Sequence, residues 1–372
     1  MKKIVLITNI PSPYRVDLFY YMQNTLKEYD IHIVYTSANE DNRNWKINDC
    51  KLINSYILKS KIIKIKNDID TRYVHIPSSI GKILNKLHPN IIIAWEYNLA
   101  AIEALIWSKK NDCRFIHLTD GTLYSERNIN TIQKITRKII IQNCNAAIAS
   151  STKAREKLIS WGLDSKKIAT SYLTFDLSKI EKKQKDLEGD EGRVLYVGSM
   201  VKRKGLDLLI ESLPYITTNY QLRIVGSGSK CEMDKLEQLA NRLGVKDNIC
   251  FCGYKDGDEL FEEYNKARVF VLPTREDCYG LVLVEALCFD VPIVASKYAD
   301  GAYDIVKNEK NGFIVDPYNS SQMGKSINKI LLSDTYKQNA KKMDKRSFQF
   351  ENVVKGYIKA IKISEGVYEG DG

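Results

Sequence analysis

The chain consists of two series of short apolar segments that alternate with longer amphipathic segments. Because neighbouring parallel strands are joined by helical crossovers, this alternation is typical of parallel sheets covered by helices. We therefore expect an α/β protein with two doubly wound, Rossmann-like domains that face a cleft. In the first half, the strand-like segments are 2–8, 31–36, 90–95, 114–119 and 145–150, and the helix-like segments are 15–26, 99–110 and 129–141.

The second half repeats the pattern from residue 193 to residue 315. The whole chain of 372 residues is long enough for two ordinary domains. A charged, aperiodic segment at 181–192 separates the halves and is expected to be a linker. The predicted organisation is an amino-terminal domain at 1–180, a carboxyl-terminal domain at 193–345, and a helix and tail at 346–372. We expect that last helix to cross back to the first domain.

The apolar runs have the length of strands and fall short of the roughly 20 residues needed to span a bilayer. The opening segment MKKIVLIT is expected to be a first strand and not a signal peptide. Eight scattered cysteines form neither a zinc pattern nor a disulfide framework. These features favour a cytoplasmic protein with reduced thiols.

The formal net charge of +10 belongs to the first half of the chain. Residues 1–180 carry 27 Lys and Arg against 16 Asp and Glu. This excess indicates an anionic partner such as a membrane surface, or else a solvated lysine-rich face. A nucleic-acid partner is disfavoured because the chain has no aromatic-basic recognition motif.

Two segments of the first half combine apolar and basic residues, at 59–66 and 129–141. In the second, isoleucines recur at helical spacing with lysines and an arginine between them, as in an interfacial helix on a membrane. Alternatively, this stripe packs on the sheet of the first domain. Both readings stay open at the level of sequence. The isoleucines concerned are Ile129, Ile132, Ile135 and Ile139.

The segment at 273–296 is the most informative about function. An apolar strand leads into a polar turn, then a helix that opens near Gly280 and Leu281, then another strand. Asp277 in the turn and Glu285 in the helix are eight positions apart, so both carboxylates can face one crevice and accept hydrogen bonds from hydroxyls. The helix start offers backbone N–H groups to a diphosphate. Carboxylates for hydroxyls and amides for phosphate describe a nucleotide-sugar site.

Two further loops of the second half are expected at the same sheet edge. The loop 197–205 contains Gly198 and places Arg203 and Lys204 where cations neutralise a leaving diphosphate. The loop 225–230 contains Gly226 and Gly228, which allow a close approach of the backbone to a ligand. A dinucleotide site is disfavoured because the third glycine of that motif is missing.

These blocks, at 197–213, 223–254, 271–296 and 311–315, together resemble the donor-binding half of the family 4 retaining glycosyltransferases, which have the GT-B fold. The segments NIPSPYRVDLF, LTDGTLYSER and ASSTKAREKLISWG of the first half resemble members that build bacterial surface polysaccharides. The first-loop Gly-Gly of the family is replaced here by Pro11-Ser12-Pro13.

The resemblance implies roles for individual residues. Lys204 is expected to bind the donor diphosphate, Glu285 the ribose, and Asp277 the hydroxyls of the transferred sugar. Asp277 stands where the family carries a glutamate. Ser199 stands at the position of the family's arginine, so Arg203 is the substitute. The candidate donor residues are Gly198, Arg203, Lys204, Gly226, Gly228, Tyr254, Asp277, Gly280, Leu281 and Glu285.

In the first half, Asp120 and His117 are catalytic candidates together with Lys204 and Asp277, because they end a strand at the expected cleft. His117 is alternatively a histidine in the sheet interior. Glu96 is an acceptor-side candidate and alternatively a solvated loop charge. The other acceptor-side candidates are Pro13, Tyr14 and Arg15.

The triplets Asp68-Ile69-Asp70 and Asp256-Gly257-Asp258 are expected to be surface turns and not metal sites. The resemblance implies no cofactor and no metal. It implies a glycosyltransferase that moves a sugar from a nucleotide-sugar donor to a glycan acceptor, lipid-linked at the inner membrane face, with retention of configuration. The alternative is a non-catalytic nucleotide-sugar-binding protein of the same fold. The sequence leaves the donor base, the sugar and the linkage open.

Overall fold

The computed structural model describes residues 1–40, 51–66, 71–181, 183 and 192–367. Within these ranges the chain divides into two compact units. The first contains residues 1–66, 71–176 and 347–367, and the second contains residues 177–346. The first unit thus ends four residues before the expected boundary at 180. The expected linker at 181–192 lies almost entirely outside the described residues.

The first unit is built on a seven-stranded parallel sheet of order β3-β2-β1-β6-β7-β8-β9. Its central strands are almost wholly apolar and buried, as expected for a sheet covered on both faces. The strands are β1 (Lys2–Thr8), β2 (Tyr29–Tyr35), β3 (Ser55–Ile57), β6 (Ile91–Trp95), β7 (Arg114–Thr119), β8 (Ala146–Ala149) and β9 (Ile168–Thr170).

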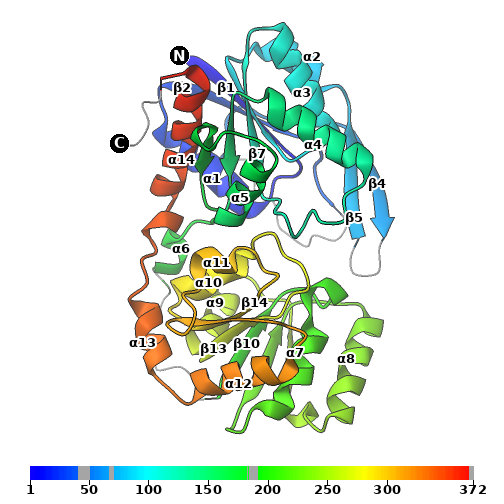
Figure 1. The fold of residues 1–372 in the computed structure, drawn as a ribbon, viewed down its shortest axis with the longest axis vertical. Helices are drawn as coiled ribbons and strands as arrows, with labels where there is room; N and C mark the ends of the chain where they lie inside the picture. Colours follow the sequence, from blue (N-terminus) through cyan, green and yellow to red (C-terminus); the bar gives the residue numbers. More distant parts are fainter. Residues whose placement is uncertain (41–50, 67–70, 182, 184–191, 368–372) are drawn as a thin grey trace. The chain divides into compact units, whose positions relative to one another are not determined.

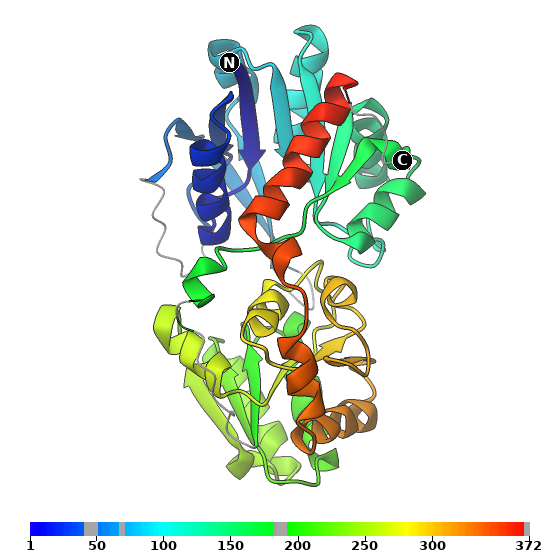
Figure 2. The ribbon, with the colours of Figure 1, turned by 90° about the vertical axis from the view of Figure 1, so that its left-hand side faces the viewer.

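Two layers of helices cover this sheet (Figures 1 and 2). On one face, α1 (Pro13–Thr25) and α14 (Phe350–Glu365) pack through residues such as Phe19 and Tyr357. The carboxyl-terminal helix is therefore part of the first unit, although about 170 residues of the other unit precede it. The other face carries α2 (Ile80–Leu87), α3 (Leu99–Lys110), α4 (Thr131–Asn143) and α5 (Thr152–Ser160).

A separate antiparallel pair, β4 (Ser60–Lys66) and β5 (Thr71–Pro77), belongs to the same unit (Figure 1). The sequence pattern did not reveal this pair, because the segment 59–66 was interpreted only as an apolar and basic surface segment. The helix α2 was also missed.

The second unit has a six-stranded parallel sheet of order β12-β11-β10-β13-β14-β15. The helices α7, α8 and α12 pack on one face, and α9 and α10 contact strands β10 and β14. The strands are β10 (Arg193–Val197), β11 (Gln221–Val225), β12 (Ile249–Gly253), β13 (Val269–Leu272), β14 (Ile293–Ser296) and β15 (Gly312–Val315). The helices are α6 (Ser178–Glu181), α7 (Leu206–Ser212), α8 (Lys230–Arg242), α9 (Gly257–Lys266), α10 (Leu281–Cys288), α11 (Ala302–Ile305), α12 (Ser320–Leu331) and α13 (Thr335–Lys341).

The prediction of two α/β domains with parallel sheets is confirmed. One local prediction is wrong: Asp256-Gly257-Asp258 is exposed, but it begins α9 instead of forming a turn, because Asp256 occupies the N-cap position. The triplet Asp68-Ile69-Asp70 lies outside the described residues. Among the described residues, no helix combines the length and the apolar character that crossing a bilayer requires.

Candidate functional site

The loops that follow β10, β11, β12 and β13 all lie at the carboxyl edge of the second sheet, since these neighbouring strands are parallel. These loops carry most of the candidate donor residues. Position 226 requires glycine for two reasons. Its φ of +144° is a backbone conformation that other residues rarely adopt, and a Cβ there would clash with the carbonyl oxygen of Gly198. Gly228 similarly lies against the side chain of Met200.

The loops after β10 and β13 are joined by backbone hydrogen bonds. Lys202–Lys204 forms a 3₁₀ turn that is followed by Gly205, so Arg203 and Lys204 lie three and two positions before Leu206, the first residue of α7. The backbone N–H of Arg275 donates to the carbonyl oxygen of Arg203 at 2.8 Å. Two segments about 70 positions apart in sequence are thereby held side by side.

Lys204, Arg203 and Asp277 converge at this junction. The Lys204 Nζ donates to Asp277 Oδ2 at 2.5 Å, and Arg203 Nη1 lies 4.0 Å from the same oxygen. Arg203 Nη1 also donates to the carbonyl oxygen of Glu276 at 3.0 Å. The three side chains are mostly buried and carry a net charge of +1, so the cluster favours an anion.

The backbone and the side chain of Asp277 are both fixed. Its N–H donates to the carbonyl oxygen of Tyr298 at 3.0 Å, and its carbonyl oxygen accepts from Asp300 N at 3.0 Å. Burial opposes ionisation of the Asp277 carboxyl, but Lys204 and Arg203 together hold its pKa below the usual value. Asp277 is therefore a carboxylate at neutral pH.

Glu285 lies in the second turn of α10 and has a different partner. Tyr264 of α9 donates its hydroxyl to Glu285 Oε2 at 2.7 Å. Burial raises the pKa of Glu285, although the hydrogen bond from Tyr264 opposes the shift. The expectation that Asp277 and Glu285 serve one ligand stays a prediction, since each has its own protein partner.

Three other candidate donor residues lie at the same edge of the sheet, two at the start of α10 and one after β12. Gly280 precedes α10 with a φ of +81°, and Leu281 is the first residue of that helix. Tyr254 follows β12 and is half exposed.

In the first unit, the candidates lie at the carboxyl ends of the adjacent strands β1, β6 and β7. Arg15 of α1 donates from Nη1 to Thr8 Oγ1 at 2.7 Å, and its Nη2 lies 3.4 Å from Asp120 Oδ2. Glu96 Oε1 accepts from the backbone N–H of Asp120 at 2.7 Å. The structure thus brings Arg15, Glu96 and Asp120 into one cluster.

Glu96 is not a solvated loop charge. Its φ of +59° and its bonds to Thr119 and Asp120 hold the carboxyl group against the end of β7. Burial, followed by the nearby charge of Asp120, raises the pKa of Glu96 to about 7. A carboxyl group with such a pKa exchanges protons near neutral pH.

His117 is fully buried in β7, and its ring lies 4.4 Å from that of Tyr97. Neither ring nitrogen has a hydrogen-bond partner within the part of the chain that the structure describes. Burial, aided by Lys157 and Arg137, keeps the pKa of His117 well below its usual value, so the ring is neutral. This location matches the sheet-interior alternative.

Pro13 and Tyr14 are the first residues of α1, and Ser12 precedes them at the N-cap position. Tyr14 contacts the neighbouring guanidinium group, because Arg15 Cζ lies 5.5 Å from the centre of its ring.

Sequence reasoning missed a buried cation, Lys157 of α5. Its Nζ lies 3.3 Å from Glu126 Oε2 and 3.3 Å from Thr119 Oγ1, and its side chain has no exposed surface. Arg137 Nε donates to the same Glu126 oxygen at 2.8 Å. Burial lowers the pKa of Lys157. One signal was available: Lys157 shares the buried helical face of Ala154 and Leu158.

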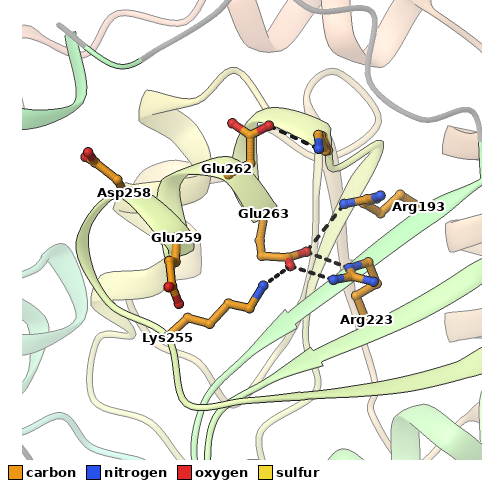
Figure 3. A pocket seen from close by; sticks show the side chains of 8 residues that line it. Arg193, Arg223, Lys255, Asp258, Glu259, Glu262 and Glu263 are labelled. Atoms are coloured by element: carbon orange, nitrogen blue, oxygen red, sulfur yellow. Dashed lines mark hydrogen bonds and ion pairs between the residues drawn. The ribbon is translucent and has the colours of Figure 1, made fainter.

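A cavity of about 500 Å³ in the second unit contains no candidate residue (Figure 3). Beside it, Glu263 of α9 accepts from Arg223 Nε and Nη2 at 2.6 Å and from Lys255 Nζ at 2.5 Å. Arg193 Nη1 lies 3.5 Å from the same carboxylate. All three cations contact the Glu263 carboxylate, and the residues that line the cavity comprise four cations and four carboxylates, so we interpret the cluster as structural.

The second half of the chain is similar to known proteins. Residues 178–349 match the model of the family "Glycosyl transferases group 1". An uncharacterized glycosyltransferase from Methanocaldococcus jannaschii is 31% identical over 182 residues, covering 48% of this chain and 46% of that protein. The capsular polysaccharide biosynthesis glycosyltransferase CapM of Staphylococcus aureus is 29% identical over 240 residues, covering 61% and 62%. The alignments therefore cover 46% and 62% of the lengths of these two relatives.

Solved structures resemble the whole chain. HepE of Anabaena in complex with UDP and glucose superposes with a TM-score of 0.74 at 17% identity, covering 97% of this chain and all of that one. Sucrose-phosphate synthase from Thermosynechococcus elongatus gives a TM-score of 0.77 at 18% identity, with 99% and 100% coverage. At such identities the likeness shows the fold. Residues 178–349 therefore resemble the glycosyl transferases group 1 family, in a chain that has the GT-B fold.

Proposed function

We propose that the protein is a glycosyltransferase that moves a sugar from a nucleotide-sugar donor to a hydroxyl group of a glycan acceptor. The observation that carries this proposal is the cluster of Arg203, Lys204 and Asp277 at the carboxyl edge of a group 1 domain. Open parallel sheets bind ligands at this edge, and the cluster offers cations in a partly buried setting.

Lys204 has three N–H donors and uses one for Asp277, so two remain for the oxygens of a diphosphate. Arg203 adds a second positive charge to the cluster. As the bond between the sugar and the diphosphate breaks, negative charge grows on the leaving phosphate, and both cations stabilise it. Fixed charges of this kind are usually the largest contribution to such a reaction.

Glu285 is proposed to accept hydrogen bonds from the ribose hydroxyls, and the amides at the start of α10 to face the phosphates. Burial of Glu285 and its bond to Tyr264 support a carboxylate held in one orientation. Asp277 is proposed to bind hydroxyls of the transferred sugar.

We further propose retention of configuration, without a metal ion, in the synthesis of a surface polysaccharide on a lipid-linked acceptor. Similarity to CapM, which is named for capsular polysaccharide biosynthesis, supports the proposed role in polysaccharide synthesis. In the retaining family that the sequence resembles, the leaving phosphate oxygen takes the proton of the acceptor hydroxyl. The acceptor-side candidates are Glu96, Asp120 and Arg15.

Differential melting with UDP-, GDP-, dTDP- and ADP-sugars tests the donor site, because a ligand of the folded state raises the melting temperature. HepE was solved with UDP, so UDP-sugars come first in the panel. No shift with any donor would contradict the site. Stereochemistry is read separately, from the anomeric NMR signal of the first product.

The alternative is a non-catalytic nucleotide-sugar-binding protein. Two observations favour it: Asp277 is shorter than the glutamate that the family carries, and Ser199 replaces its arginine. Donor-dependent melting without release of nucleoside diphosphate across an acceptor panel would support this alternative.

A further inference from the structure

The helix α4 exposes an apolar stripe. Ile132 is 75% exposed, Ile135 is 54% exposed and Ile139 is 45% exposed, and their spacing places them on one side of the helix. The buried residues of α4 are Ile140 and Ile141. The alternative that this stripe packs on the sheet is therefore wrong, because α4 contacts the unit through its other side.

Three neighbouring elements, β4, β5 and α3, continue the exposed apolar surface. The helix α3 packs against both α4 and β5, so these elements are contiguous, on the right-hand side of the first unit in Figure 1. We call this surface the isoleucine face. Its exposed apolar residues are Ile63 and Ile65 of β4, Val74 and Ile76 of β5, Leu99 and Ile106 of α3, and Ile132, Ile135 and Ile139 of α4.

The antiparallel pair of β4 and β5 exposes one apolar side because its other side contacts the rest of the first unit. Ile63 is paired with Val74 across the two strands, and alternate residues such as His75 point to the opposite face. His75 is buried, with Nδ1 3.0 Å from Thr36 Oγ1 and Nε2 3.2 Å from Glu40 Oε1. The exposure of Ile63 and Val74 thus follows from the register.

Basic residues accompany the isoleucine face. The elements β4, β5, α3 and α4 contain nine Lys and Arg residues and one acidic residue, Glu103; one of the nine, Arg137, is mostly buried against Glu126. Glu103 is engaged by α2, where it accepts from Ser79 Oγ at 2.5 Å and Gly81 N at 3.0 Å. Lys134 and Lys138 of α4 are exposed beside the isoleucines.

We propose that the isoleucine face docks the protein on an anionic phospholipid bilayer. Exposed isoleucines enter the interfacial region while neighbouring lysines contact anionic headgroups, as in amphipathic helices that lie on membranes. A symmetric pair of chains joined through this face would set lysines against lysines. The proposal goes beyond sugar transfer and uses no residue of the donor site.

The test is co-sedimentation of the full chain with vesicles of phosphatidylcholine alone or mixed with phosphatidylglycerol. We expect binding to the mixed vesicles at low salt, and weaker binding at physiological salt. The variant Ile132→Ser/Ile135→Ser/Ile139→Ser is expected to lower the partition coefficient by at least about tenfold. The matched control, Ile159→Ser/Leu332→Ser, changes exposed apolar residues outside the face and should bind as the parent does.

A second pair of variants separates charge from apolar contact. Lys134→Gln/Lys138→Gln should weaken binding to the mixed vesicles by about fivefold per lysine, whereas Lys230→Gln/Lys235→Gln on the exposed side of α8 should not. All variants should keep the parent's melting temperature and its shift with nucleotide, which separates this proposal from that of the donor site.

Three results would overturn the docking proposal. The first is a parent protein that stays in the supernatant with mixed vesicles at low salt, and the second is a triple variant that binds as well as the parent. The third is a dimer, found by light scattering, that dissociates in the triple variant while the parent does not bind vesicles, since the face would then join two copies of the chain.

Discussion

Lys204 Nζ lies 2.5 Å from Asp277 Oδ2, although 73 positions separate the two residues in sequence. They follow β10 and β13, which are neighbours in the sheet. The pair joins the residue expected to bind the diphosphate with the one expected to bind the sugar. A donor bound here would share Lys204 with Asp277, so each residue affects what the other can bind.

The variant Lys204→Ala is expected to lose about 10²–10³ in turnover, because it removes a cation that stabilises the leaving phosphate. Nucleotide-dependent melting should weaken as well. Lys202→Ala is the matched control, since Lys202 belongs to the same 3₁₀ turn but is exposed. If the two variants retain similar turnover, the diphosphate is bound elsewhere.

Asp277→Asn is expected to separate nucleotide binding from sugar transfer. The change removes a negative charge that competes for Lys204 and repels phosphate, so a nucleoside diphosphate should bind at least as tightly as to the parent. Turnover of the nucleotide sugar should fall, because a carboxylate that accepts from sugar hydroxyls is lost. Isothermal titration with the diphosphate and a turnover assay give both values. A joint fall in affinity and turnover would assign Asp277 a purely structural role.

Glu285→Gln tests the proposed ribose contact. Because burial raises the pKa of Glu285, ionising its carboxyl group costs more free energy in the folded protein than in the unfolded chain. The protonated carboxyl group of Glu285 therefore stabilises the folded protein at low pH, and this stabilisation is lost as the pH rises through the folded pKa. The neutral glutamine should therefore melt no lower than the parent at neutral pH, yet show a smaller shift with nucleotide.

Tyr264→Phe is the control for Glu285→Gln, since it keeps the carboxylate and removes its 2.7 Å hydrogen bond. It should retain most of the nucleotide shift. An undiminished shift in Glu285→Gln would remove this residue from the site.

The parallel sheets could be predicted because their strands are buried on both faces and form short apolar runs between helices. The hairpin of β4 and β5 could not. The sequence of β4 does not alternate: Lys61 and Ile63 share one side of the strand, and Ile62 and Lys64 share the other, so it does not indicate which side faces the protein. That choice depends on the contacts of His75 with Thr36 and Glu40, which are tertiary.

The candidate site shows the same limit. Motif spacing identified Lys204 and Asp277 individually, but their ion pair depends on β10 and β13 being neighbours, and strand order is not written in local sequence. Lys157 was overlooked because a lysine usually marks a solvated position. Only its helical register with Ala154 and Leu158 indicated burial.

Glu263→Gln is expected to destabilise the second unit by about 3 kcal/mol at neutral pH. Burial disfavours the Glu263 carboxylate, but hydrogen bonds from Arg223 and Lys255 outweigh it and lower its pKa from 4.5 to about 2. A shift of this size between unfolded and folded states corresponds to about 3 kcal/mol. The stability is present above the unfolded pKa and is lost as pH falls through the folded pKa. The difference in unfolding free energy between parent and variant should therefore decrease as the pH falls below about 4.5, and it should vanish near pH 2, which is about the folded pKa.

The control for this experiment is Glu262→Gln, the neighbouring residue, which forms an exposed pair with Lys266 at 3.1 Å. Such surface pairs contribute less than about 1 kcal/mol, so this variant should unfold nearly as the parent does. Urea titrations at several pH values between neutral and acid measure both variants. Equal unfolding free energies for the parent and Glu263→Gln at neutral pH would show that the three cations of this cluster do not depend on the carboxylate, and would reopen the cavity beside it as a candidate anion site.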